Sequence, residues 1–174
     1  MCSELRDIMA AVLSRFDGSL YNSALTKFIY LLDIEAVFRN SKQVSAIKWR
    51  RDNHGPFVWD ILNCAREDKS LFTILPEAAD KRRIVLLDKG YIPHVDNEVI
   101  GILEEVIAKT PNPKTHFIDF VDYVYQTPPM LLSRKNGPLD IHGAMEAARE
   151  VNEVSDVLLN TAEWDEALRY LAAN

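Results

Sequence analysis

The stretch of chain between Ser23 and Asn40 is apolar on nearly every side when it is drawn as a helix. Its two apolar sides hold, at helical spacing, Leu25, Phe28, Ile29, Leu32 and Ala36 on one and Tyr30, Leu31, Ile34, Val37 and Phe38 on the other. A helix without a polar face has no side suited to water, and such helices lie in the interior of a protein. The pattern therefore predicts a buried central helix around which the other elements pack.

A strand-like pattern follows this helix. Between positions 44 and 51 the side chains alternate, with Val44, Ala46, Lys48 and Arg50 set against Ile47, Trp49 and Arg51. Alternation with a period of two predicts a short strand. The residues Asn53, His54 and Gly55 are typical of a turn. Pro56 is then expected to open another helix, because the first N–H of a helix needs no partner.

Shorter periodic segments predict the remaining helices. One is expected from Leu5 to Phe16. Others are expected after Asp96, Phe117, Asp140 and Thr161. The sequence Asp17-Gly18 is expected to end the first helix. Pro128 and Pro129 are expected to hold the chain extended, ahead of an irregular segment from Met130 to Pro138.

Two apolar runs predict a β-hairpin, Leu71–Leu75 and Ile84–Leu87. With the strand expected at 44–51, the hairpin would give a sheet of three strands. The predicted fold is mainly α, of the α+β class. It is a compact helical domain around a central buried helix, with a small antiparallel sheet of two or three strands. We expect a single domain over residues 1–174, in which residues 128–174 form a helical C-terminal part.

Composition narrows the class of protein. The chain has 174 residues, a net charge of −6 and 48% hydrophobic residues, which suffices for the core of one domain. The acidic balance argues against general nucleic-acid binding, because neutralising phosphates requires an excess of Lys and Arg. Cys2 and Cys64 form neither a metal-ligand pattern nor a disulfide framework, and they suit a reducing cytosol. No apolar run is long enough for a signal sequence or a membrane span, so we expect a cytoplasmic protein without a membrane partner.

The sequence carries no signature of a known catalytic site. It lacks a Gly-rich phosphate loop, a GxSxG elbow and an HExxH pair, so we expect neither enzyme activity nor a cofactor. His116, Asp119 and Asp122 share one helix face and are residue types that bind metal ions. Three such residues on one helix more often form a solvated face, and no metal is expected. Cys64 and His54 are a nucleophile and a base by type, but the apolar pattern around Cys64 favours a buried, inert thiol.

Positive side chains gather beside the predicted turn. Lys48, Arg50 and Arg51 would lie near the N-terminus of the helix expected at Pro56, where free N–H groups favour an anion. A phosphate, a carboxylate or an acidic protein surface would suit this place. The alternative is a solvated strand end whose arginines pair with acidic residues of the chain. The acidic candidates are Asp33, Glu35 and Asp60. The sequence leaves both interpretations open.

Aromatic residues accompany the positive segment. Trp49, Phe57 and Trp59 are anchors of the kind enriched at protein interfaces. A small core would use the same residues, and we expect a core position for at least two of the three. The candidate partner-binding residues are Lys48, Trp49, Arg50, Arg51, His54 and Trp59.

Two short motifs carry a resemblance to a known family. The run Leu25-Thr26-Lys27-Phe28-Ile29-Tyr30-Leu31-Leu32-Asp33 is similar to the LxKLxYLxD helix of the Panacea domain, the SocA-like antitoxin family. The IxWxxxxHGPF strand of that family is matched by Ile47, Trp49 and the run His54-Gly55-Pro56-Phe57. The resemblance covers about residues 5–124, most clearly as far as Leu87. It places Lys27, Tyr30, Asp33, Trp49, His54, Gly55 and Pro56 at motif positions.

The resemblance implies a cytoplasmic antitoxin that neutralises a cognate toxin, encoded next to it, by direct protein contact. It also implies a toxin–antitoxin system of the kind used in phage defence. One branch of the family resembles a proteolytic adaptor that delivers its toxin to a cytosolic AAA+ protease. The residues themselves do not identify the toxin.

Two other interpretations remain. A DNA-binding regulator is the alternative, because helix, strand, second helix and hairpin are similar to a winged helix. Against it, only one helix is expected between the first strand and the hairpin, and that helix offers few base-reading side chains, namely Asp60, Asn63 and Arg66. Nucleic acid is therefore not an expected partner. An enzyme site around Asp33, Arg50 and His54 is the third interpretation, which no spacing requires.

Overall fold

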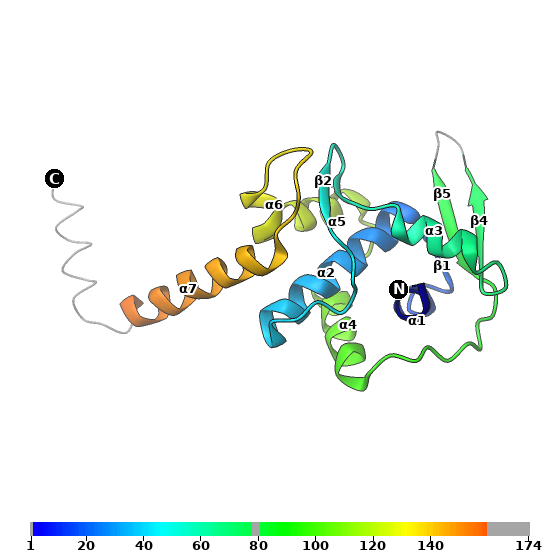
Figure 1. Ribbon diagram of the computed structural model, residues 1–174, viewed down its shortest axis with the longest axis horizontal. Helices are drawn as coiled ribbons and strands as arrows, with labels where there is room; N and C mark the ends of the chain where they lie inside the picture. The colour runs from blue at the N-terminus through cyan, green and yellow to red at the C-terminus, as the bar shows by residue number, and fades with distance from the viewer. Residues whose placement is uncertain (1, 78–80, 160–174) are drawn as a thin grey trace.

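Helices and two small antiparallel sheets make up the fold. A computed structural model describes residues 2–77 and 81–159 (Figure 1). The elements in chain order are α1 (Cys2–Ser14), β1 (Ser19–Tyr21), α2 (Asn22–Asn40), β2 (Arg50–Asp52), β3 (Gly55–Phe57), α3 (Asp60–Glu67), β4 (Phe72–Pro76), β5 (Arg82–Leu86), α4 (Asn97–Lys109), α5 (Phe117–Tyr125), α6 (Pro128–Leu132) and α7 (Ile141–Leu159). The predicted fold class, mainly α with a small antiparallel sheet, is confirmed.

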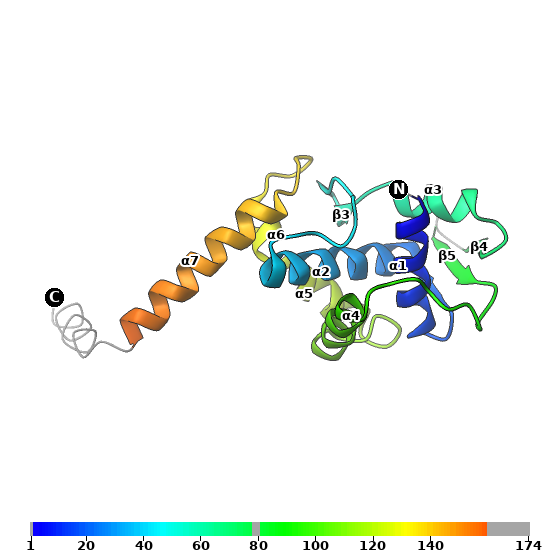
Figure 2. The same cartoon turned by 60° about the horizontal axis from the view of Figure 1, so that its bottom comes forward.

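Helix α2 is the buried centre that the sequence predicted. Thirteen of its nineteen residues are buried, on all sides of the helix. Figure 2 shows α1 crossing one end of α2 and α4 lying along its side. Phe28 of α2 joins the turn after α1 to α5, because its ring packs against Phe16 at 4.9 Å and against Phe120 at 4.8 Å between ring centres. None of the helices that the structure describes is long and apolar enough to cross a membrane.

Left-handed backbone conformations end the first two helices. Asp17 and Gly18 follow α1 with φ of 57° and 79°, and the N–H of Gly18 donates to the Leu13 carbonyl at 2.9 Å. This confirms the predicted end of the first helix. Ser41 closes α2 in the same way, with φ of 56° and its N–H on the Val37 carbonyl.

The larger sheet has the strand order β1-β5-β4. Its hairpin β4–β5 confirms the predicted one, with Ile74 opposite Ile84 and Phe72 opposite Leu86. The third strand is β1, in which Leu20 faces Ile84, so the expectation that residues 44–51 supply it is wrong. The backbone N–H of Ser45 donates to the Asp33 carboxylate instead of to a neighbouring strand, which keeps this segment out of the sheet.

The predicted alternation in residues 44–51 is nevertheless correct over most of its length. Ile47 and Trp49 are buried, whereas Ala46, Lys48 and Arg50 are exposed. Only Arg50–Asp52 forms a ladder, as strand β2 paired with β3. The helix expected to start at Pro56 is wrong, because Pro56 lies in β3 opposite Arg51 and α3 starts at Asp60. A proline fits a strand at the edge of a two-stranded ribbon as well as it fits the first turn of a helix.

The proline pair at 128–129 also differs from the expectation. Pro128 and Pro129 open the short helix α6 instead of holding the chain extended. Their missing N–H groups cost nothing in a first turn. The irregular segment expected from Met130 is helical as far as Leu132. The chain then passes beside β2, where the Arg51 N–H donates to the Gly137 carbonyl at 2.9 Å.

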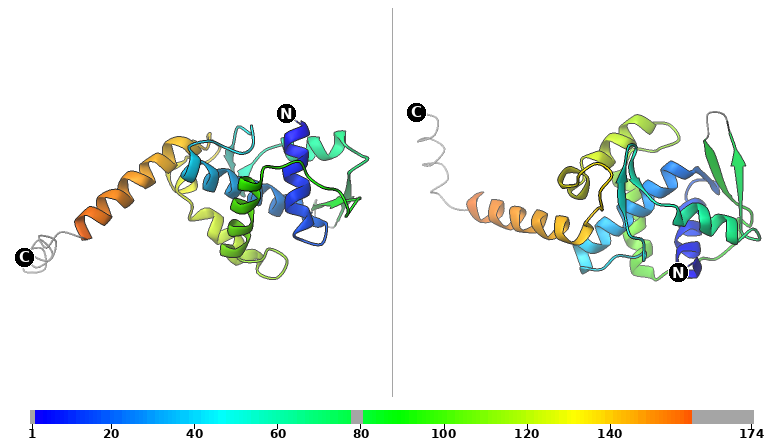
Figure 3. Two further views of the ribbon diagram at one scale, coloured as in Figure 1. Left: turned by 90° about the horizontal axis from the view of Figure 1, so that it is seen from below. Right: turned by 45° about the horizontal axis from the view of Figure 1, so that its top comes forward.

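Helix α7 confirms the Ala-rich helix expected after Asp140 and runs further than expected, to Leu159. Its first turns pack on α2 and α6, and it then extends away from the body (Figure 3). Arg149 fixes this contact, because its guanidinium donates to the Val37 and Phe38 carbonyls at the end of α2. The last helix expected after Thr161 lies outside the described residues.

The N-terminal half has the element order of a winged helix with a two-stranded ribbon inserted. β1 is followed by α2, the ribbon β2–β3, α3 and the hairpin β4–β5, and β1 pairs with β5. One helix, α3, lies between the segment 44–51 and the hairpin, as the sequence predicted. β1 was not expected, because its three residues, Ser19–Tyr21, are too few to show an alternating pattern. With β1 as the first strand, two helices lie between it and the hairpin, so the helix count does not argue against a winged helix.

Candidate partner-binding site

The site is built on one buried polar face of α2. Lys27, Tyr30 and Asp33 recur every three residues on this face and are 4%, 0% and 0% exposed. They face the segment from Gln43 to Phe57, which is called here the hairpin segment. Buried polar groups must find partners to offset the loss of water. Each of the three side chains finds its partner across this contact or beside it.

Asp33 anchors the first half of the hairpin segment. Its carboxylate accepts hydrogen bonds from the Ser45 N–H at 2.8 Å, the Ser45 hydroxyl at 2.5 Å, Gln43 Nε2 at 3.1 Å and Trp49 Nε1 at 2.8 Å. Burial raises the pKa of Asp33, and the hydrogen bonds from Ser45, Trp49 and Gln43 oppose that rise. Four donors on one carboxylate hold residues 43–49 against α2.

Tyr30 supports the same segment from the middle of the face. Its ring meets the ring of Trp49 edge-on, with 5.4 Å between centres and 72° between planes. Its hydroxyl is 3.1 Å from Thr127 Oγ1. Burial raises the pKa of Tyr30 above its usual range, so the hydroxyl stays protonated. Trp49 is 3% exposed and belongs to the core, whereas Phe57 is half-buried and Trp59 is exposed, so the expected core position for at least two of these three residues is wrong.

Lys27 and Gly55 fix the tip of the hairpin segment. Lys27 Nζ donates to the His54 carbonyl at 3.0 Å, and burial lowers the pKa of Lys27 to about 8. Gly55 has φ of +100°, a conformation that favours glycine. A Cβ on Gly55 would lie 3.3 Å from Cε2 of Tyr125 and 3.6 Å from Cε of Lys27. The tip therefore accepts only glycine without strain.

The six candidate partner-binding residues fall into three groups. Lys48, Arg50, His54 and Trp59 are exposed, and Trp59 keeps 54% of its surface accessible. Arg51 is half-buried and Trp49 is buried. The Trp59 ring meets the half-buried Phe57 ring edge-on, with 5.1 Å between centres.

The two arginines bind backbone oxygens and not carboxylates. Arg51 Nη1 donates to the carbonyls of Met130 at 2.7 Å and Ser133 at 2.8 Å, where a cation suits the C-terminal end of α6. Arg50 Nη2 donates to the Asn136 carbonyl at 3.1 Å. Of the two interpretations left open by the sequence, the pairing of these arginines with Asp33, Glu35 or Asp60 is not found among the described residues. The anion site at a helix N-terminus at Pro56 is not formed either, since no helix starts there.

The other chemical candidates are placed as follows. Cys64 is buried, at 3% exposure, on α3. His116, Asp119 and Asp122 are all exposed. Within residues 2–77 and 81–159 no group of three or more His, Cys, Asp or Glu side chains is arranged to hold a metal ion.

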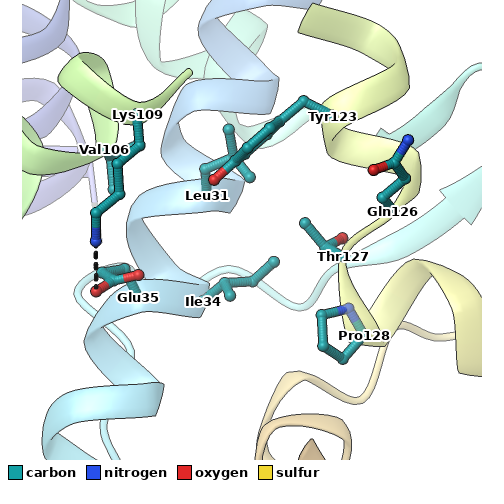
Figure 4. A pocket seen from close by; sticks show the side chains of 9 residues that line it. All are labelled: Leu31, Ile34, Glu35, Val106, Lys109, Tyr123, Gln126, Thr127 and Pro128. Atoms are coloured by element: carbon teal, nitrogen blue, oxygen red, sulfur yellow. Dashed lines mark ion pairs between the residues drawn. The ribbon is translucent and has the colours of Figure 1, made fainter.

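The sequence did not reveal a pocket between α2, α4 and α5 (Figure 4). Leu31, Ile34 and Val106 give it an apolar floor, and its volume is about 320 Å³. On one rim Lys109 Nζ lies 3.9 Å from Glu35 Oε1, and from the other side Tyr123 reaches over the floor toward Leu31. Its walls come from three separate parts of the chain, so no local pattern marks it. An apolar side chain of a partner would fit here.

Fold and site together define a class: a mainly helical domain in which a buried polar helix face fixes an exposed hairpin. Residues 25–129 match the family described as antitoxin SocA-like, Panacea domain, and the chain belongs to this family. The match supports an antitoxin role in general terms. It begins at Leu25, later than the resemblance suggested, and extends to Pro129. No curated protein and no solved structure matches the chain.

Proposed function

We propose that this protein is the antitoxin of a toxin–antitoxin pair and neutralises its cognate toxin by direct binding, without a catalytic step of its own. Family membership supports the antitoxin role. The exposure of the His54 side chain is the observation that supports neutralisation by direct binding. The other six motif residues, Lys27, Tyr30, Asp33, Trp49, Gly55 and Pro56, are all buried. The His54 side chain is exposed and makes no hydrogen bond or ion pair within the described residues.

A motif side chain that does nothing for the fold is available for a partner. Lys27 binds the backbone oxygen of His54, so the chain needs this position for its carbonyl and leaves the imidazole in solvent. Lys48, Arg50 and Trp59 add exposed charge and an aromatic anchor on the same hairpin segment and its continuation. An acidic patch with an apolar centre on the toxin would complement them.

Growth of cells that express the neighbouring reading frame, with and without this protein, tests the proposal. Rescue by the wild type is expected, with weaker rescue by His54→Ala and Trp59→Ala. Truncation of an aromatic anchor at an interface costs about 2 kcal/mol or more, which is about 30-fold in Kd. His116→Ala and Ile92→Ala are the controls, since His116 is exposed, Ile92 is 80% exposed and neither belongs to the hairpin segment.

The same cells separate two modes of neutralisation. If the protein blocks the toxin, the two co-purify and the amount of toxin is unchanged or higher. If it acts as an adaptor for an AAA+ protease, the half-life of the toxin falls when the protein is present and recovers in cells without the protease. A toxic neighbour whose toxicity is the same with and without this protein would contradict the antitoxin proposal for this pair.

DNA binding is a second candidate, which the order β1, α2, α3, β4, β5 favours, although the ribbon β2–β3 is inserted between α2 and α3. The exposed polar residues at the centre and end of α3 are Asn63, Arg66 and Glu67, and they carry no net positive charge. A helix that reads the major groove normally needs an excess of donors and cations. Titration with duplex DNA at low salt tests this candidate, and the absence of binding there would remove it.

A further inference from the structure

A second cavity, which no residue of the hairpin segment lines, lies where β1 leads into α2. It is also lined by the start of β5 and by residues just before and at the start of α5. Its volume is about 430 Å³. Cavities of a few hundred Å³ are the usual size of sites for small molecules. The family match and the proposed toxin contact leave this cavity unassigned.

The charge of the cavity is opposite to that of the chain. Lys81, Arg82 and Lys114 line it, and none of its described lining residues is acidic. Lys114 is held in place, because Nζ donates to the Phe16 carbonyl at 2.6 Å and lies 3.3 Å from Asp17 Oδ2. Arg82 is exposed and has no ion pair within the described part of the chain. Three cations around one cavity in a protein of net charge −6 favour an anionic ligand.

The first turn of α2 forms another wall. Asn22 begins this nineteen-residue helix, and the residue before it, Tyr21, provides no side-chain hydrogen bond to cap it. The first N–H groups of a long helix attract phosphate.

Two aromatic rings complete the lining. Tyr21 is fixed, because its hydroxyl donates to Glu77 at 2.5 Å and the guanidinium of Arg83 lies 4.3 Å from its ring centre. Arg83 also donates to Glu77 at 2.6 Å, so the charge of the carboxylate next to Tyr21 is neutralised. Phe117 is 43% exposed and makes no ring contact with the described aromatic residues. Its face is available to stack with a planar ring.

We propose that this cavity binds a mononucleotide. The phosphates lie between Arg82, Lys81 and the first turn of α2, and the base stacks on Phe117. Inorganic phosphate would satisfy the cations but leave Phe117 unused, and a nucleoside would stack on Phe117 but leave the cations unused, so the proposal requires both parts of the ligand. It does not depend on the proposed toxin contact.

Isothermal titration of the full chain with ATP at low salt tests the proposal, with adenosine and inorganic phosphate as partial ligands. ATP is expected to bind at least about tenfold more tightly than either one, because stacking and charge-assisted bonds each contribute about that factor. Arg82→Ala and Phe117→Ala are each expected to weaken ATP binding about tenfold. Arg66→Ala on α3 and Ile118→Ala, next to Phe117 and 75% exposed, are controls that should keep the Kd within about twofold.

Several outcomes would overturn the proposal. One is no ATP binding at millimolar concentration by a protein whose circular dichroism shows that it is folded. Another is equal weakening by the control substitutions. A third is salt-dependent binding of duplex DNA without binding of a mononucleotide, which would assign the cations to the winged-helix candidate. Toxin rescue is not a readout here, so failure of this proposal leaves the antitoxin proposal in place.

Discussion

Replacing Asp33 by Asn tests whether the buried face of α2 holds the hairpin segment. The two oxygens of Asp33 accept four hydrogen bonds, one on Oδ1 from the Ser45 N–H and three on Oδ2. Asn keeps the shape but turns one acceptor into a donor. The less unfavourable orientation places the new NH₂ group on the Oδ1 side, opposite the Ser45 N–H alone. Two buried donors then face each other without an acceptor.

The size of the effect follows from these unpaired groups. Each buried donor that loses its partner costs about 1–3 kcal/mol. Removing the charge offsets part of this free-energy cost, because burial disfavours the ionised form of Asp33, as its raised pKa indicates. We expect the free energy of unfolding of Asp33→Asn to fall by about 2 kcal/mol. Asp33→Ala leaves all four donors unpaired beside a cavity and should cost about 3–5 kcal/mol.

Urea unfolding at pH 7, followed by tryptophan fluorescence, measures the change. The midpoint should fall while the slope of unfolding free energy against urea stays constant, since the same surface is exposed. Asp122→Asn is the matched control on an exposed position of α5 and should change stability by less than about 0.5 kcal/mol. An unchanged midpoint for Asp33→Asn, or an equal loss for Asp122→Asn, would refute the assignment of Asp33 as the anchor.

Three further substitutions test other parts of the structure. Lys27 has a folded pKa of about 8 against 10.5, so the folded state holds fewer protons and stability should rise by about 3 kcal/mol between pH 8 and 10.5. In Lys27→Met, unfolding curves across that range should lack this rise, and an unchanged rise would assign it to other groups. Gly55→Ala should cost about 1–3 kcal/mol in urea unfolding because of its positive φ and the nearby Tyr125 ring, and a wild-type midpoint would contradict this. Arg149→Ala should speed hydrogen exchange in α7 but not in α1, because its bonds to the end of α2 are lost. Equal exchange in both proteins would show that α7 is held by other contacts.

Local periodicity was enough to predict the elements with long, regular patterns. The apolar circumference of α2, the stripe of α1 and the hairpin β4–β5 were each visible in short windows of sequence. Strand β1 was not, because three residues carry no measurable period. Pro56 and Pro128 were misread in opposite directions, since a proline fits both an edge strand and a helix start, and only the surrounding fold selects between them.

The sequence predicted which residues of the hairpin segment are exposed but not the partners that the others bind. Alternation placed Trp49 and Arg51 on the inner side and Lys48 and Arg50 on the outer side, as the structure has them. The bond partners of Arg51 lie about eighty positions later in the chain, at Met130 and Ser133, and no local pattern reports such contacts. The pocket over Leu31 and the cavity beside Arg82 were missed for the same reason.

The buried motif residues explain how one scaffold could serve different partners. Lys27, Tyr30, Asp33 and Trp49 specify where the hairpin segment lies, but at 0–4% exposure they cannot contact a toxin. Under the proposed function, partner choice would come from exposed positions on that segment, whose side chains can change without any change in the bonds to α2. His54 belongs to both sets, because its carbonyl binds Lys27 and its imidazole faces solvent. A loss of binding in His54→Ala without a loss of stability would therefore separate recognition from scaffold at a single residue, which no substitution on the buried face of α2 can do.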